Sequence, residues 1–326
     1  MSRQKRPLFG AIDLGGTKLL SVIATPDGEI LARDRRPSQT QEGLEAILAR
    51  MAGSLDSAAE EAGVQPSQLG AVGVASAGAI NFDRGIVSEA PQLPGWQDVP
   101  LRDLLQEQLQ LPVLLDNDAN AAGFGELTFG AGRGSRHLIY LTISTGIGGG
   151  IIIDGQLYRG KSGAAAELGH IVIDMGGPVC PCGARGCLEA IASGTAMVWR
   201  AQEALEQGRS PLLAQLAAEE PLTAELIARA ARQGDEACTE IYRVAAFALG
   251  NALASYVSIF DPNAIVLGGG IMNSSELIFE PARRTMEGMV RRLPLQGLRV
   301  LKGELGDESG VLGMVALLRR DRTFGG

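Results

Sequence analysis

Short apolar runs separated by turns open the chain and predict three strands. Residues 8–13 are mostly apolar, residues 18–24 follow a glycine turn, and residues 29–33 follow the turn TPDG at 25–28. Runs of this length with turn residues between them are typical of an antiparallel β-meander. Residues 40–63 then carry apolar positions at helical spacing, which predicts a helix after the meander.

Buried strands and helices alternate over the next stretch. GAVGVASAG at residues 70–78 is continuously apolar and glycine-flanked, which indicates a buried strand. PLRDLLQEQL at 100–109 has the spacing of a helix. PVLLDND at 112–118 reads as a further strand, and DANAAGFGEL at 118–127 reads as the helix that follows it.

The pattern then begins again, because HLIYLTISTGIGGGIIIDGQLYRG at 137–160 mirrors the opening meander. Both stretches have a strand, a Thr/Gly turn, an aliphatic strand, a DG turn and a third strand. The elements predicted after it are helices at about 188–207, 223–233, 236–259 and 309–320, and strands at 263–267 and 298–305. Two copies of strands followed by helices predict a duplicated α/β fold with a cleft between two domains.

A length of 326 residues is enough for two domains and a large core. No low-complexity or Pro-rich linker separates the halves, so we expect the chain to cross between the domains through helices. The expected division is an N-terminal α/β domain of residues 1–117 plus 310–326 and a larger C-terminal α/β domain of residues 118–309.

Charge and composition narrow the class of protein. The net charge is −8, the pI is near 5.0 and no long basic run is present, which argues against a nucleic-acid partner. No apolar stretch nears the roughly 20 residues that span a bilayer, so we expect no membrane partner. The N-terminal MSRQKRP lacks the apolar region and cleavage site of a signal peptide. We therefore expect a cytoplasmic protein. Thiols stay reduced in that compartment, so clustered cysteines indicate a metal site rather than a disulfide.

Glycine is abundant, with 44 residues, and it concentrates in DLGGTK, STGIGGG, CGARGC and VLGGGI. Turns of this kind expose backbone N–H groups that bind anions. DLGGTK is not a P-loop, since the Gly-x4-Gly-Lys spacing and the following helix are absent. A tight hairpin that merely needs glycine is the alternative. STGIGGG holds the same place in the second repeat, which favours a nucleotide held between two such hairpins, with a magnesium ion near Asp13.

Polar residues gather where a predicted strand ends and a helix begins, in LLDNDANAAGFGE. Asp116, Asn117 and Asp118 lie at this junction. Helix capping is the structural alternative, although one acid would be enough for a cap. A strand end is also the ligand-binding edge of an α/β sheet. A carboxylate there can accept a proton from an attacking hydroxyl during phosphoryl transfer.

Three of the four cysteines and one of the two histidines fall within eighteen residues of each other. His170, Cys180, Cys182 and Cys187 supply one nitrogen and three sulfurs, which is a complete tetrahedral set for Zn2+. Four protein ligands leave no open position, so the predicted zinc is structural. A disulfide would leave one cysteine unpaired, and unligated packing does not explain the glycines of CGARGC. Cys238, in a helical pattern, is interpreted as a packed small hydrophobe.

With these motifs in place, the chain resembles the ROK family, which comprises repressors, open reading frames of unknown function and sugar kinases. The similarity is to its kinase branch, close to the bacterial glucokinases, and extends over essentially the whole chain. IDLGGTK and LTISTGIGGG resemble the two phosphate loops of the actin-like ATPase superfamily, and NAIVLGGGI resembles the adenosine segment. DNDANAAGFGE and SGVLGMVALL resemble the two connecting segments, and ELGH through CPCGARGCLE is similar to the ROK signature.

The resemblance implies two duplicated actin-like (ribonuclease H-like) α/β domains and an ATP-dependent hexose kinase. A glucokinase that phosphorylates the sugar 6-hydroxyl is the leading expectation, with fructose, mannose or an N-acetylhexosamine as alternative substrates. The implied cofactors are ATP, Mg2+ and a structural Zn2+, and the implied assembly is a homodimer. A sugar-sensing repressor is a second hypothesis, but only about a dozen residues precede Asp13, too few for a DNA-binding module. A chaperone-type or actin-type ATPase would lack the sugar signature.

Residue roles follow from the resemblance position by position. Asp118 is the implied base that takes the proton from the sugar hydroxyl. The implied sugar-binding residues are Gly78, Asn117, Asp118, Glu167, His170 and Glu189. The implied residues for ATP and magnesium are Asp13, Gly15, Gly16, Thr17, Lys18, Thr145, Gly146, Gly269 and Gly270.

Two positions depart from the family pattern, and both bear on the sugar rather than on ATP. The family often has a Pro-Gly pair where GVASAGAI has Ala77-Gly78, and Gln92 stands where Asn is common.

The predicted zinc loop also affects the sugar site. One ring nitrogen of His170 would bind zinc while the other faces a sugar hydroxyl. Glu167 precedes the cysteine loop and Glu189 follows it, so the metal would fix the positions of three side chains that face the sugar. The alternative for the two glutamates is that they are ordinary solvated surface residues.

Overall fold

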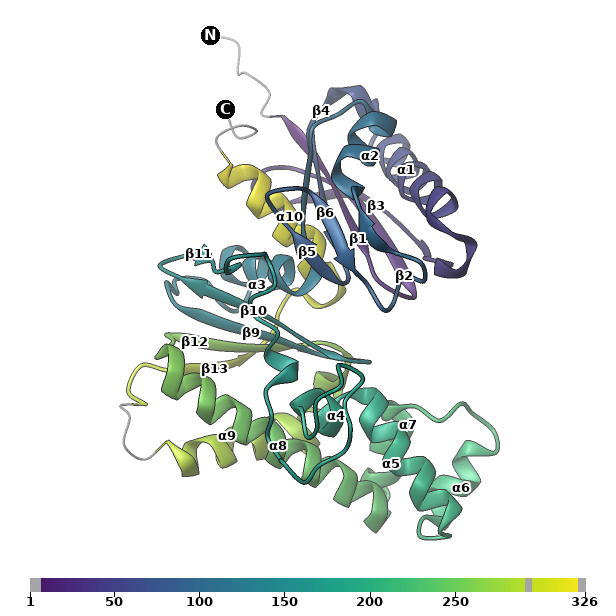
Figure 1. The fold of residues 1–326 in the computed structure, drawn as a ribbon, viewed down its shortest axis with the longest axis vertical. Helices are drawn as coiled ribbons and strands as arrows, with labels where there is room; N and C mark the ends of the chain where they lie inside the picture. Colours follow the sequence, from purple (N-terminus) through teal and green to yellow (C-terminus); the bar gives the residue numbers. More distant parts are fainter. Residues whose placement is uncertain (1–6, 291–294, 322–326) are drawn as a thin grey trace. The chain divides into compact units, whose positions relative to one another are not determined.

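The structure is a computed structural model that describes residues 7–290 and 295–321 (Figure 1). The chain divides into two compact units. The first contains Met1–Gly134, Gly150–Ala166 and Glu304–Gly326, and the second contains Ser135–Gly149 and Glu167–Gly303. Each unit is built on α/β structure, and each is described in turn.

The first unit is organised by a five-stranded sheet of order β3-β2-β1-β4-β8. β1 pairs antiparallel with β2, and β2 with β3, which confirms the predicted meander. β1 pairs parallel with β4, and β4 with β8. The strands are β1 (Leu8–Leu14), β2 (Lys18–Ala24), β3 (Ile30–Pro37), β4 (Leu69–Ser76) and β8 (Val113–Asn117). Their apolar positions are buried along nearly all of β4, as its continuous apolar run predicts.

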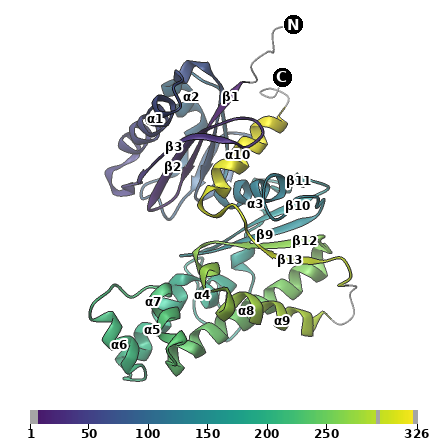
Figure 2. The same cartoon turned by 180° about the vertical axis from the view of Figure 1, so that it is seen from behind.

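Helices cover both faces of this sheet (Figures 1 and 2). α1 (Leu44–Glu61) and α2 (Leu101–Leu109) lie on one face, and α3 (Asp118–Thr128) and α10 (Ser309–Arg320) on the other. Glycines in the central strands let the helices approach. A Cβ on Gly10 would lie 2.8 Å from Leu55 of α1, and one on Gly73 would lie 2.6 Å from Met314 of α10.

α3 and α10 pack against each other so closely that glycine is needed at their contact. A Cβ on Gly313 would lie 1.7 Å from the carbonyl oxygen of Ala121, and one on Gly125 would lie 2.5 Å from that of Ser309. This packing holds α3 in the first unit, which therefore continues to Gly134. The division observed thus differs from the expected boundary between residues 117 and 118.

A small sheet in the first unit has no counterpart in the sequence analysis. β5 (Ala79–Asn81), β6 (Ile86–Glu89) and β7 (Gln97–Val99) form an antiparallel sheet of order β5-β6-β7. Strands of three or four residues are too short for a periodic pattern to be read from the sequence. This sheet begins directly after Gly78 and so places the loop that carries that residue.

A second five-stranded sheet has the order β11-β10-β9-β12-β13. Its strands are β9 (Leu138–Ile143), β10 (Ile147–Ile153), β11 (Gln156–Leu157), β12 (Ala264–Gly268) and β13 (Arg299–Lys302). β10 and β11 pair antiparallel, whereas β9, β12 and β13 pair parallel. The order matches that of the first sheet, which confirms the predicted duplication. The boundary between the two units falls within β10.

Helices make up most of the second unit. They are α4 (Leu188–Ala192), α5 (Gly194–Glu206), α6 (Pro211–Ala217), α7 (Ala224–Arg232), α8 (Glu236–Phe260) and α9 (Ser275–Met289). The single helix predicted at 188–207 is two helices. Ser193 separates them, because its side chain accepts the Ala196 N–H and caps α5. Short 3-10 helices span Thr40–Glu42, Pro66–Gln68, Leu168–His170, Gly270–Ser274 and Gly306–Glu308.

Among the described residues, α8 alone is long and apolar enough to cross a membrane by length and composition. Of its most apolar window, 56% is buried inside the protein, as in the core helix of a globular domain. Tyr256 on α8 also donates a 2.5 Å hydrogen bond to the carbonyl oxygen of Leu168. These contacts explain the apolar composition of the helix by packing.

Candidate active site

The first glycine turn joins β1 to β2 in the first unit. The Gly15 N–H donates to the carbonyl oxygen of Lys18 at 3.0 Å and closes the turn. The Ser38 hydroxyl donates to the carbonyl oxygen of Gly15 at 2.6 Å and holds it from outside. Thr17 and Lys18 are exposed, so their hydroxyl and ammonium groups are accessible to a ligand. A turn with these properties suits a phosphate group.

Asp13 lies at the end of β1, beside that turn. Burial is the main cause that raises its pKa to about 7, and the negative charges of Asp118 and Asp307 contribute to the same rise. Gly310 in the first turn of α10 makes room for this carboxylate, since a Cβ there would lie 2.6 Å from Asp13 Oδ2. A divalent cation would relieve the repulsion among these carboxylates. The arrangement therefore fits the magnesium role predicted for Asp13.

Asp307 was not predicted, and it belongs to the same electrostatic cluster. Its carboxylate accepts a hydrogen bond from Arg35 Nη1 at 2.7 Å and lies 3.8 Å from Lys18 Nζ. The hydrogen bond from Arg35 is the main cause that lowers the pKa of Asp307. Asp307 reaches this place from the far end of the chain through the 3-10 helix before α10, so no local sequence signal pointed to it.

Asn117 caps α3, which makes the capping alternative correct for this residue. Its Oδ1 accepts the N–H groups of Ala119 and Asn120 at 3.0 and 3.1 Å. Its Nδ2 donates to the carbonyl oxygen of Gly78 at 3.1 Å. The amide carries a second Nδ2 hydrogen, which can donate to a ligand. A cap and a binding role are therefore compatible in one side chain.

Asp118 is the first residue of α3, and its Oδ1 accepts the Ala119 N–H at 2.8 Å. The N-terminus of a helix favours a negative charge. Gly78 approaches this site through the Asn117 bond and adopts φ +102°, where a Cβ would lie 2.4 Å from the carbonyl oxygen of Glu89. The first unit thus brings together Gly78, Asn117 and Asp118, and Asp118 is close enough to Asp13 to raise its pKa.

The second glycine turn joins β9 to β10. The Ser144 N–H donates to the carbonyl oxygen of Gly146 at 2.9 Å. Gly146 lies against Glu189, because a Cβ there would be 2.6 Å from Glu189 Oε2, and that oxygen accepts the Ile147 N–H at 2.7 Å. Thr145 at the tip is exposed. The turn predicted to hold phosphate is therefore tied directly to a residue predicted to hold the sugar.

The turn after β12 lies at the same edge of the second sheet. β9 and β12 are parallel neighbours, so their carboxyl ends meet. Gly269 has φ +89°, and a Cβ on it would lie 2.3 Å from the carbonyl oxygen of Ile143. A Cβ on Gly270 would meet nothing within 4 Å. This places Thr145 and Gly146 near Gly269 and Gly270 and leaves open backbone for a ligand at Gly270.

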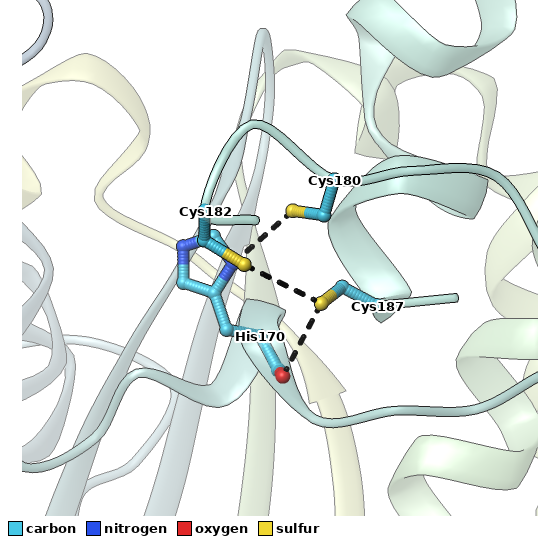
Figure 3. Close-up of side chains that lie close together, drawn as sticks. All are labelled: His170, Cys180, Cys182 and Cys187. Atoms are coloured by element: carbon cyan, nitrogen blue, oxygen red, sulfur yellow. Dashed lines mark hydrogen bonds between the residues drawn. The ribbon is translucent and has the colours of Figure 1, made fainter. Parts of the chain in front are cut away.

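His170, Cys180, Cys182 and Cys187 converge in the second unit (Figure 3). Their ligand atoms all lie within 4.8 Å of one another. Cys182 Sγ lies 3.7 Å from Cys187 Sγ, and Cys180 Sγ lies 3.5 Å from His170 Nδ1. A tetrahedral zinc with Zn–S bonds of about 2.3 Å holds its sulfurs about 3.8 Å apart. The donor set and its spacing therefore fit Zn2+.

The loop that carries these ligands depends on two left-handed glycines. Gly183 and Gly186 have φ of +91° and +76°. A Cβ on Gly186 would lie 1.5 Å from the carbonyl oxygen of Asp174, so no other residue fits there. Burial raises the pKa of Cys187 to about 12 and raises that of Cys180. A hydrogen bond from the Ala184 backbone lowers the pKa of the exposed Cys182.

The two ring nitrogens of His170 face different neighbours. Its Nδ1 lies toward Cys180, while its Nε2 lies 3.9 Å from Glu167 Oε2 and 4.0 Å from Glu189 Oε1. Burial raises the pKa of Glu167, His170 opposes that shift, and Glu189 adds to it. The second unit thus brings Glu167, His170 and Glu189 together at the edge of the cysteine cluster. Cys238 is buried in α8 away from it.

Comparisons with known families and proteins extend over nearly the whole chain. The model of the ROK family matches residues 9–321. A glucokinase from Thermotoga maritima is 38% identical over 318 residues, which are 97% of this chain and 98% of that protein. A xylose repressor from Caldicellulosiruptor bescii is 31% identical over 310 residues, which are 95% of this chain and 77% of the repressor.

A solved structure shows the same likeness. The ROK family glucokinase from Streptomyces griseus, in complex with glucose and AMPPNP, matches with a TM-score of 0.83 and 35% identity. The match covers 96% of this chain and all of that one. It includes both units of the present structure.

The raised pKa of the half-buried Asp13 gives a prediction about stability. A folded pKa of about 7, against an ordinary value near 3.8, means that folding favours protonated Asp13. This contribution is present below about pH 4 and is lost as the pH rises to about 7. Asp13→Asn should therefore raise the free energy of unfolding at pH 8, by on the order of 3 kcal/mol, and change it little at pH 4. Urea unfolding in metal-free buffer at both values measures this, with the exposed Asp27→Asn as control. Equal pH dependence in Asp13→Asn and the unsubstituted protein would contradict it.

Proposed function

This chain belongs to the ROK family, and we propose that it is an ATP-dependent hexose kinase, most simply a glucokinase. It transfers the γ-phosphate of ATP to the 6-hydroxyl of the sugar. The family and the two-domain actin-like α/β fold expected from the motifs are confirmed by the comparisons. The observation that carries the proposal is full-length similarity to glucokinases together with Asp118 at the start of α3, where a general base is required.

The phosphate groups of ATP are assigned to the two glycine turns. In the first unit, the N–H groups of Gly15 and Gly16, the hydroxyl of Thr17 and the ammonium of Lys18 supply donors. In the second unit, Thr145 and Gly146 do so, and Gly269 and Gly270 leave backbone open for adenosine. Asp13 would hold Mg2+, which in phosphoryl transfer neutralises charge on the β- and γ-phosphates.

Asp118 accepts the proton from the sugar hydroxyl as the oxygen attacks phosphorus. Asn117 can donate its remaining Nδ2 hydrogen to a sugar hydroxyl while it caps α3. Glu167, the Nε2 of His170 and Glu189 are the proposed sugar ligands of the second unit. Their carboxylates accept hydrogen bonds from hydroxyl groups, which is the pattern that a polyhydroxylated ligand requires.

A sugar-sensing repressor is the second candidate, and the similarity to a xylose repressor favours considering it. The higher identity to a glucokinase and the presence of Asp118 favour the kinase.

Among substrates, fructose, mannose and N-acetylhexosamines stay as alternatives to glucose. Gln92 packs against Gly16 of the first turn, since a Cβ on Gly16 would lie 3.0 Å from it. In this structure the departure at Gln92 therefore touches the phosphate turn.

Asp118→Asn tests the proposal. The substitution keeps the shape and removes the base, so turnover should fall by about 100- to 10,000-fold while ATP binding persists. A coupled assay of ADP release over a panel of hexoses, with ATP and Mg2+, measures this and identifies the sugar. The exposed Asp83→Asn is the matched control. Near-normal turnover in Asp118→Asn would remove the residue from catalysis, and absence of sugar-dependent ADP release in the unsubstituted protein would overturn the kinase.

We further propose that His170, Cys180, Cys182 and Cys187 hold one structural Zn2+. Without a metal, the two buried thiols favour the protonated form, because burial raises their pKa values. Zinc binds thiolates and so competes with those protons. Since His170 offers Nδ1 to the cluster and Nε2 to Glu167 and Glu189, the ligand set fixes the orientation of a proposed sugar ligand.

Cys182→Ser should release the zinc, because Cys182 is the exposed ligand and its loss leaves three. Glucose affinity should fall by about 10-fold or more, because loss of the groups that orient a ligand-binding side chain usually has an effect of this size. Nucleotide binding should persist. Elemental analysis and calorimetric titration with each ligand measure these effects, and Cys238→Ser is the matched control. Zinc-free active protein would exclude the metal, and unchanged glucose affinity in zinc-free Cys182→Ser would exclude its positional role.

The proposed partners are the hexose, ATP and a second copy of the chain. An exposed apolar surface supports the homodimer. Phe247 and Ile259 of α8 are 53% and 69% exposed, and with Val172 they line a shallow hollow of about 680 Å3. Exposed patches of this kind mark association surfaces. The net charge of −8 supports the absence of a nucleic-acid partner, and we propose a cytoplasmic protein without a membrane partner.

Phe247→Glu should convert the proposed dimer to a monomer, because each copy would bury a charge at the shared surface. Size-exclusion chromatography with light scattering measures the mass of both proteins. The exposed Trp199→Glu on α5 is the matched control, and it should leave the mass unchanged. A monomeric unsubstituted protein, or a dimeric Phe247→Glu protein, would show that this surface is not the interface.

A further inference from the structure

Asp116 is a buried carboxylate that the proposed reaction does not use. It lies in β8, directly before Asn117 and Asp118, and is 1% exposed. A buried charge needs a partner, because removing it from water is costly. Arg159 provides one: its Nε and Nη2 both donate to Asp116 Oδ2, at 2.9 and 2.6 Å.

The other oxygen of Asp116 contacts the candidate active site. Oδ1 accepts the backbone N–H of Asn117 at 2.9 Å and the Nδ2 of Asn120 at 3.3 Å. The first bond fixes the peptide that leads into the N-cap of α3. The second reaches the first turn of the helix that begins with Asp118. A single carboxylate therefore connects Arg159 to the backbone that carries the proposed base.

Arg159 is itself held in place. Its guanidinium carbon lies 4.0 Å from the ring centroid of Phe82, at the start of the loop between β5 and β6. Its carbonyl oxygen accepts the Ala165 N–H at 3.1 Å. In the segment that follows Arg159, Gly163 has φ +87°. Only glycine fits there, because a Cβ would lie 2.0 Å from the carbonyl oxygen of Ile80. The segment is thus folded against β5, which begins next to Gly78.

We propose that the Arg159–Asp116 ion pair, stacked on Phe82, positions Asn117 and Asp118 for the reaction, and this inference rests on the proposed function. Arg159 joins the end of β8, which leads to Asn117 and Asp118, to Phe82, which follows the strand that begins after Gly78. Lysine cannot replace it, because its single ammonium nitrogen lacks the planar group that places two nitrogens on Asp116 Oδ2 and stacks on the Phe82 ring. Arg159 and Asp116 are positioning residues and touch no substrate.

Arg159→Lys keeps the charge and removes the planar contact. Hydrogen exchange of the amides at residues 117–120 should accelerate by about 10-fold or more in this variant. In the hexose assay, the sugar KM should rise and the ATP hydrolysed per sugar phosphorylated should increase by about 5-fold or more, because a base misplaced by about 1 Å loses much of its advantage over water. Both assay quantities are independent of how much protein is folded, so a merely structural role would not change them.

Phe82→Leu keeps the ion pair and removes only the stacking, so it should change the same quantities in the same direction by about 2- to 5-fold. Arg319→Lys, in an exposed pair with Asp27, is the matched control. Unchanged exchange and sugar KM in folded Arg159→Lys would overturn the inference, and unchanged values in Phe82→Leu would overturn it if Arg159→Lys does not fold. Absence of turnover in the unsubstituted protein would count against the proposed kinase alone, since the exchange measurement tests the positioning without any reaction.

Discussion

The burial of carboxylates close to one another is the constraint on which the first unit depends. Burial acts most on Asp13, the charges of Asp118 and Asp307 add to its effect, and Asp116 is also buried. Each acid is balanced differently: Asp118 by the N-terminus of α3, Asp307 by Arg35 and Lys18, and Asp116 by Arg159. Asp13 has a pKa raised to about 7, mainly by burial. An external cation would stabilise its ionised form, which suits the magnesium role proposed for this residue.

In the second unit, two thiols of the cysteine cluster are buried ionisable groups. Cys180 and Cys187 are almost fully buried, and burial disfavours their thiolate forms. The proposed cation would stabilise a loop that places three sulfurs and an imidazole nitrogen within 4.8 Å of one another. The same loop carries His170 between Glu167 and Glu189, and Glu189 in turn lies against Gly146. The residues with proposed metal, sugar and phosphate roles are therefore neighbours: His170 lies beside Glu189, and Glu189 lies beside Gly146.

Duplication of one topology explains why each sheet has a glycine turn at the same place. Both sheets place a hairpin beside parallel strands, and in each a glycine turn follows the first strand. The copies have diverged in their surroundings. The first turn is held by Ser38 and lies beside Asp13, whereas the second is held through Glu189 and lies beside Gly269. One copy thus provides the acids, and the other provides the glutamates proposed to bind the sugar and the cysteines proposed to bind zinc.

The sequence by itself determined the meanders, the duplication, most helices and the clustering of one histidine with three cysteines, because these depend on local periodicity and on residue types close together in the chain. It also brought out Asn117 and Asp118, although it could not show that Asn117 both caps a helix and keeps a donor hydrogen. Only the tertiary structure decided the short strands β5 to β7, the break at Ser193, and the place of α3 beside α10. Asp307 and Arg159 reach their partners across 272 and 43 residues. Such pairs carry no local pattern, since it is the packing of distant segments that brings their charges within hydrogen-bonding distance.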